Sequence, residues 1–419
     1  MYAHTQPNVL FGSNSPYNGH STQNARLIVL DAENGQPAVD ISDPANASYL
    51  MAPEPNSFFN NPFLPVAQKR SPVWTNHVLY YGLTISRNEV TGIDSGALYR
   101  LQMVDTNGDP LSVSQWKLKR FYQTDRPVTG AVNSTYDNRG NLWVLFGTGR
   151  LWSQEDIAPC AGISEYAACV ANHDQYIFGV KEGIDPITGY MTFEDKSRAN
   201  LVDVSGAKVF NDGSVTGLTS QTGITTGVGG TAQYYTLAAE IKASGVGGYK
   251  RKLSSGEIYY PNETHNYEMI ITQPKLISMG STRSYMAFTS FEPKETSCGE
   301  NGYGYLYLVD TFTGLPEPQT YSAFYTGENS ATVRPASLQP NQVPGVLSTG
   351  SGLPTEAFVT VSAAGVTVSA SSPNMDRRDI YLEPGVAGDA RGITSWKEVM
   401  NYGFEITPDK MIDGLDGGI

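Results

Sequence analysis

The chain has 419 residues, of which 40% are hydrophobic and only 16% charged, and it carries 43 Gly, 25 Pro and 25 Tyr. This composition excludes a disulfide-dependent miniprotein and argues against a disordered chain or a coiled coil. A net charge of −13 argues against nucleic acid and anionic membranes as partners, and no apolar run approaches the roughly 18 residues that predict membrane insertion.

Apolar segments that end in a polar residue before a Gly turn recur along the chain. Four share this pattern: residues 26–31, 99–105, 176–181 and 305–310. A weaker copy, residues 248–253, precedes Gly256. Recurrence at a period of tens of residues is typical of repeat architectures, in which each unit is a small group of secondary-structure elements.

Further β-branched and aromatic runs predict more strands between these copies. They are residues 78–85, 141–146, 282–289 and 357–362, whereas the best helical segment is the short stretch 395–401. The sequence therefore predicts an all-β chain.

Strands in repeated units suit a modified β-propeller of six or seven blades, similar to the quinoprotein propellers and with long loop insertions. A pair of β-sandwiches is the alternative. We expect one domain over residues 1–419, with an irregular lead-in at 1–25 and a tail at 402–419. The polar stretches 36–63 and 202–246 are expected to be exposed insertions.

The three cysteines leave two interpretations open. Cys160 and Cys169 are nine residues apart and suit a disulfide, but three reduced thiols fit equally well. Cys298 has no obvious partner. A zinc site is disfavoured because no C-x-x-C occurs and the histidines are scattered.

One segment resembles a calcium loop. Asp105, Asn107 and Asp109 occupy its first, third and fifth positions, but Trp116 stands at the twelfth position, where a bidentate Glu belongs. Asn107-Gly108 is also a common hairpin turn. We therefore favour a turn over a metal site.

No catalytic motif emerges, so we expect no enzyme. The Ser-x-x-Lys match at residues 114–117 is attributed to chance. We expect Tyr99, Trp143, Tyr305 and Tyr307 to pack between sheets. Aromatic residues of predicted loops either form a contact surface or pack locally: Tyr17, Phe58, Phe59, Tyr259, Tyr260 and Tyr267.

Residues 137–150, which include the run Gly-Asn-Leu-Trp-Val-Leu-Phe-Gly-Thr-Gly-Arg, are the most specific part of a family resemblance. With residues 73–82, 96–100, 126–130 and 302–310 in the same order, the chain resembles the C-terminal propeller of the PilC/PilY-type type IV pilus tip proteins. The similarity runs from about residue 26 to about residue 401. Its signature residues are Gly140, Asn141, Trp143, Gly147, Gly149 and Arg150.

The resemblance implies a non-enzymatic protein that supports pilus assembly and extension, twitching motility and surface adhesion. Minor pilins and a host or abiotic surface are the implied partners, and the location would be extracellular, at the pilus tip or cell surface. Since residues 1–20 do not read as a signal peptide, we expect the chain to correspond to the family's C-terminal module. A quinoprotein-like periplasmic oxidoreductase is the alternative.

The chain departs from the family at the calcium loop that the resemblance places before residues 80–83. Residues 65–76 contain no Asp or Glu. We therefore expect no cofactor to be required, and calcium remains only as the alternative at Asp105, Asn107 and Asp109.

Overall fold

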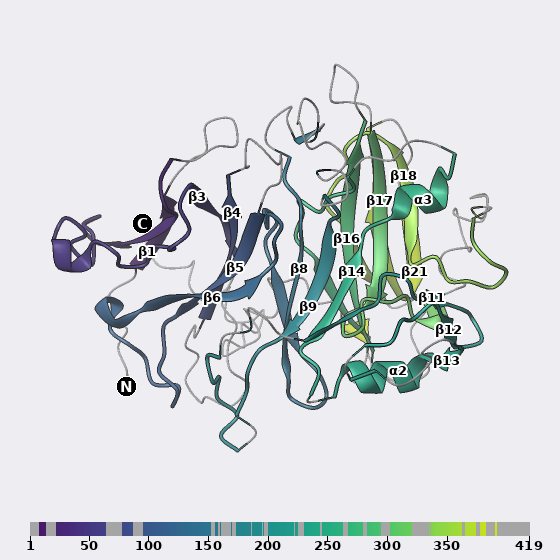
Figure 1. Ribbon diagram of the computed structural model, residues 1–419, viewed down its shortest axis with the longest axis horizontal. Coiled ribbons are helices and arrows are strands. Elements are labelled where there is room, and N and C mark those ends of the chain that lie inside the picture. Colours follow the sequence, from purple (N-terminus) through teal and green to yellow (C-terminus); the bar gives the residue numbers. More distant parts are fainter. Residues whose placement is uncertain are drawn as a thin grey trace, which may run out of the picture.

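Strands are the predominant regular secondary structure of the described chain, in agreement with the all-β prediction (Figure 1). The computed structural model describes residues 8–13, 22–63, 78–86, 95–151, 156–157, 160, 169, 173–185, 187–194, 196, 200–221, 223–224, 230–243, 245–262, 267–279, 283–294, 302–320, 335, 337–362, 365–373, 378–382 and 390–391. The predicted helix 395–401, the tail 402–419, Tyr17, Cys298 and residues 65–76 lie outside this part of the chain, as does most of the lead-in 1–25.

The N-terminal half begins with a two-stranded and a four-stranded antiparallel sheet. Strands β1 and β2 pair with each other, and β3, β4, β5 and β6 follow one another in chain order. Their bounds are Asn8–Ser13, Arg26–Asp31, Ser57–Phe63, Val78–Ile85, Ser95–Gln102 and Lys117–Gln123. The expected exposed insertion 36–63 is wrong for its last part, which forms β3 with Phe58 and Phe59 buried, whereas residues 36–49 are mostly exposed.

The second large sheet has the order β7-β8-β9-β14-β10. The first four strands are antiparallel, and the edge strand β10 runs parallel to β14. Their bounds, in the order of the sheet, are Asn133–Tyr136, Leu142–Gly147, Tyr176–Lys181, Gly248–Lys252 and Leu201–Asp203.

The chain between β9 and β14 is a long insertion, but it is not the exposed loop predicted over residues 202–246. It forms the small sheet β11-β12-β13 and the helix α2 (Tyr234–Ile241). The three short strands are Lys208–Val209, Ser214–Thr216 and Ala232–Gln233. Tyr234, Leu237, Ala238 and Ile241 are buried on one face of α2. Apolar side chains at this spacing lie on one side of a helix, so the insertion contributes to the core.

The C-terminal half contains a sheet of order β22-β15-β16-β17-β18 and a second sheet, β19-β20-β21. Strands β15 to β21 are Lys275–Met279, Arg283–Pro293, Gly302–Asp310, Val346–Ser351, Phe358–Ser362, Gly365–Ala370 and Arg378–Leu382, and β22 is Ala390–Arg391. The short helix α3 (Ser255–Tyr259) follows β14. Gly256 lies inside this helix, so the turn expected after the weaker sequence copy is wrong.

Three single turns of 3-10 helix complete the described elements. They are Pro44–Asn46, Val113–Gln115 and Pro318–Thr320. No helix among the described residues is long and apolar enough to cross a membrane.

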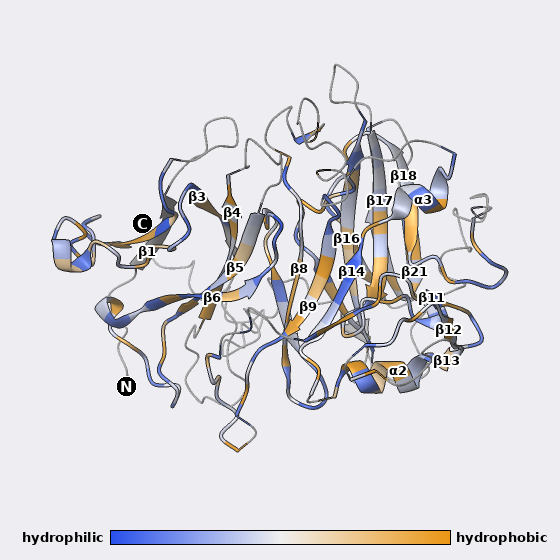
Figure 2. Ribbon diagram, viewed as in Figure 1, coloured by the Kyte–Doolittle hydropathy of each residue, from blue (hydrophilic) through white to orange (hydrophobic). Residues whose placement is uncertain are grey.

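The sheets pack face to face, and β8 shows how. Leu142, Val144 and Phe146 join the core against the sheet β3–β6, while Trp143 and Leu145 join the core shared with the C-terminal sheets. Because successive residues of a strand point to opposite faces, both faces of this sheet are buried. Figure 2 accordingly shows apolar colour along β8 and β9. Tyr99, Trp143, Tyr305 and Tyr307 are buried, as expected.

Aspartate turns close several of the strands that the repeated pattern predicts. The carbonyls of Asp31, Asp105 and Asp310 accept the backbone N–H of Gly35, Gly108 and Gly314, and each of these glycines has a positive φ. Each carboxylate also accepts a backbone N–H two residues downstream. The predicted Gly turns are confirmed at these strands, and aspartate closes each of them.

Candidate functional site

The residues that carry the resemblance lie in and around β8, and Asp137 binds the first part of this segment. Its buried carboxylate accepts the backbone N–H of Arg139 and of Asn141, each at 2.9 Å. It also accepts the side-chain N–H groups of Asn141 at 2.8 Å and of Trp143 at 3.0 Å. One carboxylate thus accepts hydrogen bonds both from the backbone of the turn before β8 and from the buried indole of Trp143 in β8.

Gly147 and Gly149, at the end of β8, allow a close approach to the segment before β15. A Cβ atom at Gly147 would lie 2.5 Å from the side chain of Ile270, and one at Gly149 would lie 2.5 Å from Cβ of Met269. The backbone N–H of Ile270 donates to the carbonyl of Thr148. The two glycines of the signature therefore permit contact between neighbouring sheets.

Arg150, the last signature residue, forms a buried ion pair with Asp156. Its Nε and Nη2 atoms lie 2.7 and 2.6 Å from Oδ1 of Asp156, and both side chains are 1% exposed. Removing one member of such a pair leaves a buried charge, which costs about 3–5 kcal/mol. The pair anchors the chain that leads to Cys160.

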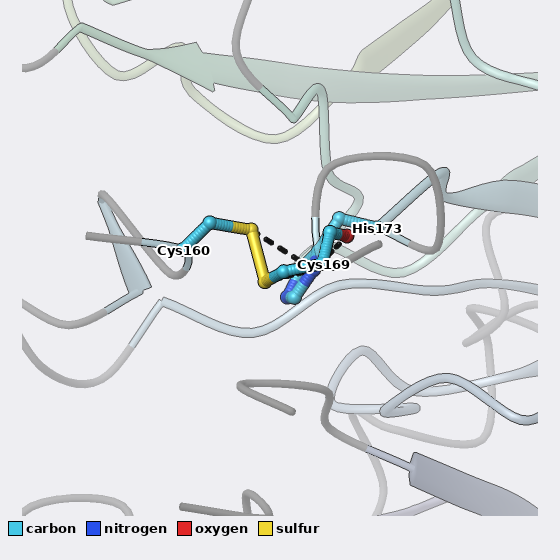
Figure 3. A group of neighbouring side chains, drawn as sticks. All are labelled: Cys160, Cys169 and His173. Carbon is cyan, nitrogen blue, oxygen red and sulfur yellow. Dashed lines mark hydrogen bonds between the residues drawn. A yellow bond between two sulfur atoms is a disulfide. The ribbon is translucent and has the colours of Figure 1, made fainter. Parts of the chain in front are cut away.

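Cys160 and Cys169 are joined by a disulfide (Figure 3). His173 Nδ1 lies 3.6 Å from Sγ of Cys160, 3.4 Å from Sγ of Cys169 and 3.0 Å from the carbonyl oxygen of Cys169. The hydroxyl of Tyr267 lies 3.0 Å from Sγ of Cys160, and its ring packs on the His173 imidazole at 4.6 Å. Among the described residues, Cys160, Cys169 and His173 are the one group of three close enough to hold a metal ion.

His173 and Tyr267 were not identified from the sequence as neighbours of the cysteines. The four-residue spacing of Cys169 and His173 was the available signal, since it allows two side chains to meet within one helical turn. Tyr267 is more than ninety residues away along the chain, and only the fold brings it to the disulfide.

Trp143 also contacts a buried lysine. Lys181 Nζ lies 5.0 Å from the centre of the indole ring and donates to the carbonyls of Ile241, Ala243 and Val246 at 2.7–2.9 Å. Ile241 is the last residue of α2 and the other two carbonyls follow it, at the helix end where backbone acceptors lack helical partners. Burial lowers the pKa of Lys181 to about 8. The lysine therefore connects the signature strand to the insertion.

The structure brings Asp105, Asn107 and Asp109 together as a turn. Oδ1 of Asp105 accepts the backbone N–H of Asn107 at 2.8 Å and that of Asp109 at 2.9 Å. The hydrogen bond from Asp109 is the largest cause of the lowered pKa of Asp105. The carboxylate is occupied by backbone donors, as in the other aspartate turns of this chain.

Two buried glutamates form hydrogen-bond networks elsewhere in the described chain. Glu182 pairs with Arg100 at 2.6 Å and accepts the hydroxyl of Tyr80 at 2.7 Å. Glu268 accepts hydroxyls of Ser255, Ser290 and Tyr307 together with the backbone N–H of Ser255, and burial raises its pKa. Their oxygen atoms are saturated by fixed donors, which is the pattern of a structural network.

The aromatic residues expected in loops divide into three groups. Phe58 and Phe59 lie in β3 and are buried, so their expected position in a loop is wrong, and of the two alternatives the structure shows packing. Tyr259 and Tyr260 are half-buried and pack on Tyr305 and Tyr303 of β17. Tyr267 packs on His173, as described above.

Comparisons with known proteins identify no family. No family model and no curated protein matches the sequence. Among solved structures, an exo-1,5-alpha-L-arabinanase from a bovine ruminal metagenomic library is similar at 10% sequence identity and a TM-score of 0.26, over 93% of this chain and 97% of that one. A similarity this distant carries no conclusion about fold or function.

Proposed function

We propose that the face-to-face sheets are blades of a modified β-propeller with six or seven blades. The four strands β3–β6 follow one another in chain order, and so do β15–β18. The sheet β7-β8-β9-β14-β10 is buried on both faces between its neighbours. In a propeller, small antiparallel sheets pack face to face around a ring and leave only short, protected edges, and the serial packing of these sheets supports such an arrangement.

We further propose that this chain is a non-enzymatic, type IV pilus tip-associated protein that supports pilus assembly and extension, twitching motility and surface adhesion. The observation that carries the proposal is the segment from Asp137 to Arg150, the most specific part of the resemblance to PilC/PilY-type proteins. Each signature residue in it has a defined role. Gly140 has a positive φ and donates its N–H to the carbonyl of Asp137, and Asn141 and Trp143 donate to the Asp137 carboxylate. Gly147 and Gly149 admit the next sheet, and Arg150 pairs with Asp156.

The proposed location is extracellular, at the pilus tip or on the cell surface. The Cys160–Cys169 disulfide is compatible with an oxidising compartment. Minor pilins are the proposed partners within the pilus, and a host or abiotic surface is the proposed adhesion target.

Deletion of the gene in its host, followed by counting surface pili, tests this function. We expect fewer pili, reduced twitching and weaker attachment, all restored by the wild-type gene. The protein could support pilus number either by promoting assembly or by opposing retraction. A second deletion, in a strain that cannot retract pili, separates these two roles, because a protein that only opposes retraction is dispensable there. Unchanged piliation, twitching and attachment in a host without a second copy would contradict the proposal.

Replacement of Asp137, which binds the signature residues Asn141 and Trp143, provides a sharper test. Asp137→Ala is expected to fail in complementation, whereas Asp105→Ala, which disrupts an equivalent turn at the surface, is expected to complement. A coloured quinone cofactor on the purified protein would support the oxidoreductase alternative instead.

A further inference from the structure

The donor atoms around the Cys160–Cys169 disulfide already have two of the spacings of a tetrahedral zinc site. With Zn–S bonds of about 2.3 Å and Zn–N bonds of about 2.0 Å, tetrahedral geometry places each sulfur about 3.5 Å from the nitrogen. His173 Nδ1 lies 3.6 Å from one sulfur and 3.4 Å from the other. All three side chains are buried, and Figure 3 shows the imidazole beside both sulfur atoms.

We propose that the reduced chain binds one Zn²⁺ through the thiolates of Cys160 and Cys169 and Nδ1 of His173, and that disulfide formation expels the ion. The two forms exclude each other because a sulfur atom in a disulfide is no longer a thiolate ligand. On reduction, the sulfur atoms separate to the roughly 3.8 Å that two thiolates of a tetrahedral site require.

The fourth position of the site faces a hydroxyl group. Structural zinc sites are four-coordinate, and the described side chains around the sulfurs include the Tyr267 hydroxyl at 3.0 Å from Sγ of Cys160. This hydroxyl, or a water molecule held by it, completes the coordination. The ring contact of Tyr267 with His173 fixes the orientation of the imidazole.

The imidazole changes its tautomer between the two forms. Beside the disulfide, Nδ1 lies 3.0 Å from the carbonyl oxygen of Cys169, so that nitrogen carries the proton as donor. Zinc takes the lone pair of Nδ1 and leaves the proton on Nε2.

The interconversion balances in electrons and protons. A dithiol reductant breaks the S–S bond, delivers two electrons and two protons to Cys160 and Cys169, and becomes a cyclic disulfide. Zinc binding then releases two thiol protons to solvent. Oxidation by a protein disulfide removes the two electrons again and releases Zn²⁺.

Cobalt titration of the full chain tests the site. The chain is reduced with dithiothreitol, desalted without oxygen and titrated with Co²⁺. We expect one equivalent to bind with thiolate-to-cobalt charge-transfer absorption and the ligand-field bands of a tetrahedral site, and Zn²⁺ to displace it. The oxidised chain is expected to show neither band.

Three variants define the ligands. His173→Ala is expected to weaken cobalt binding by about tenfold or more, and Cys160→Ser to abolish the charge-transfer band. Cys298→Ser retains both proposed thiolates and is the matched control, with binding unchanged. His173→Ala keeps both cysteines, so its ability to form the disulfide and an unchanged circular dichroism spectrum show that it folds.

The proposal is overturned by several outcomes. They are a reduced chain that binds no cobalt, cobalt binding that survives unweakened in His173→Ala, and bands that disappear in Cys298→Ser.

Discussion

Asp137 is the residue on which the signature segment depends most. Replacement by Ala leaves the buried indole N–H of Trp143 and the backbone N–H groups of Arg139 and Asn141 without their acceptor. Since each buried donor left unsatisfied costs roughly 1–3 kcal/mol, we expect Asp137→Ala to lower the free energy of unfolding by about 2–4 kcal/mol. Urea denaturation measures this change.

The matched control for Asp137 is Asp105→Ala. Asp105 makes the same kind of turn, but its backbone donors from Asn107 and Asp109 are at the surface, where water replaces the carboxylate. We expect a loss below about 1 kcal/mol. Equal losses in the two variants would show that burial of the indole donor is not the source of the effect.

Asp310, at the end of β17, gives a pH-dependent prediction. Burial raises the pKa of its carboxyl group from an ordinary 3.8 to about 6. Between these pH values the folded state binds more protons than the unfolded state. The contribution of this carboxyl group to the free energy of unfolding is therefore fully present below about pH 4 and is lost as the pH rises through 6. Asp310→Asn, which keeps an acceptor for the N–H of Phe312, is expected to reduce this decline by at most about 3 kcal/mol.

Urea denaturation at intervals from pH 4 to pH 7 tests the behaviour of Asp310. The control is Asp212→Asn. Asp212 is exposed, and the side-chain hydrogen bond from Ser214 lowers its pKa, so this substitution is expected to change the pH dependence of stability only below about pH 4. Parallel curves for wild type and Asp310→Asn over the whole range would contradict the assignment.

Residue types and spacings made part of the candidate site predictable from the sequence. The nine-residue spacing of Cys160 and Cys169 was compatible with a disulfide, but it could not exclude free thiols. The turn at Asp105 was favoured because Asn-Gly is a hairpin signal. His173 and Tyr267 could not be placed, because their approach to the cysteines depends on contacts distant in sequence.

At the scale of elements, α2 depends on a side chain from another strand. Lys181 of β9 donates to three carbonyls that follow this helix. Lys181→Met removes the ammonium donor from all three carbonyls, of which that of Ala243 keeps the backbone N–H of Val246. We expect a loss of about 2–4 kcal/mol in the free energy of unfolding together with faster amide hydrogen exchange in residues 234–246. Denaturation and hydrogen exchange followed by mass spectrometry measure the two effects.

Lys250→Met provides the comparison for Lys181. Lys250 also lies over a ring, 5.4 Å from that of Tyr176, and 3.3 Å from a carboxylate oxygen of Asp203, but it is 36% exposed. Surface pairs of this kind contribute at most about 1 kcal/mol. Unchanged exchange in α2 on loss of Lys181 would show that the helix is held by its apolar face alone.

The elements foreseen from the sequence were those with the strongest local signal. Apolar runs before Asp and Gly became β2, β5 and β17, because strand and turn signals there coincide. Helix α2 was missed since it has only eight residues, although its buried positions 234, 237, 238 and 241 follow the helical period. Its stability comes from packing, which a short sequence window does not report.

At the scale of the whole molecule, the sheets have arrangements that sequence periodicity could not give. Strand β14 pairs with β9 although sixty-six residues separate Lys181 from Gly248, and the inserted segment packs into the same core. Strand β6, rich in Lys and Arg, forms an outer edge of its sheet. Charged edge strands discourage pairing with other chains, so this edge is protected.

The last prediction concerns calcium and the stability of the whole chain. We expect EDTA to change the melting temperature of the oxidised protein by less than about 2 °C, because residues 65–76 carry no carboxylate and the carboxylate of Asp105 is bonded to backbone donors. A site saturated at a thousand times its Kd would contribute about 4 kcal/mol, and removing it would lower the melting temperature by several degrees. The oxidised protein is used because Cys160 and Cys169 are then joined in the disulfide and offer no thiolate to a metal. A drop beyond about 4 °C that calcium reverses would contradict the prediction. If Asp105→Asn abolished that drop, the ion would lie in the Asp105 turn, and if the drop persisted, the ligands would lie elsewhere in the chain.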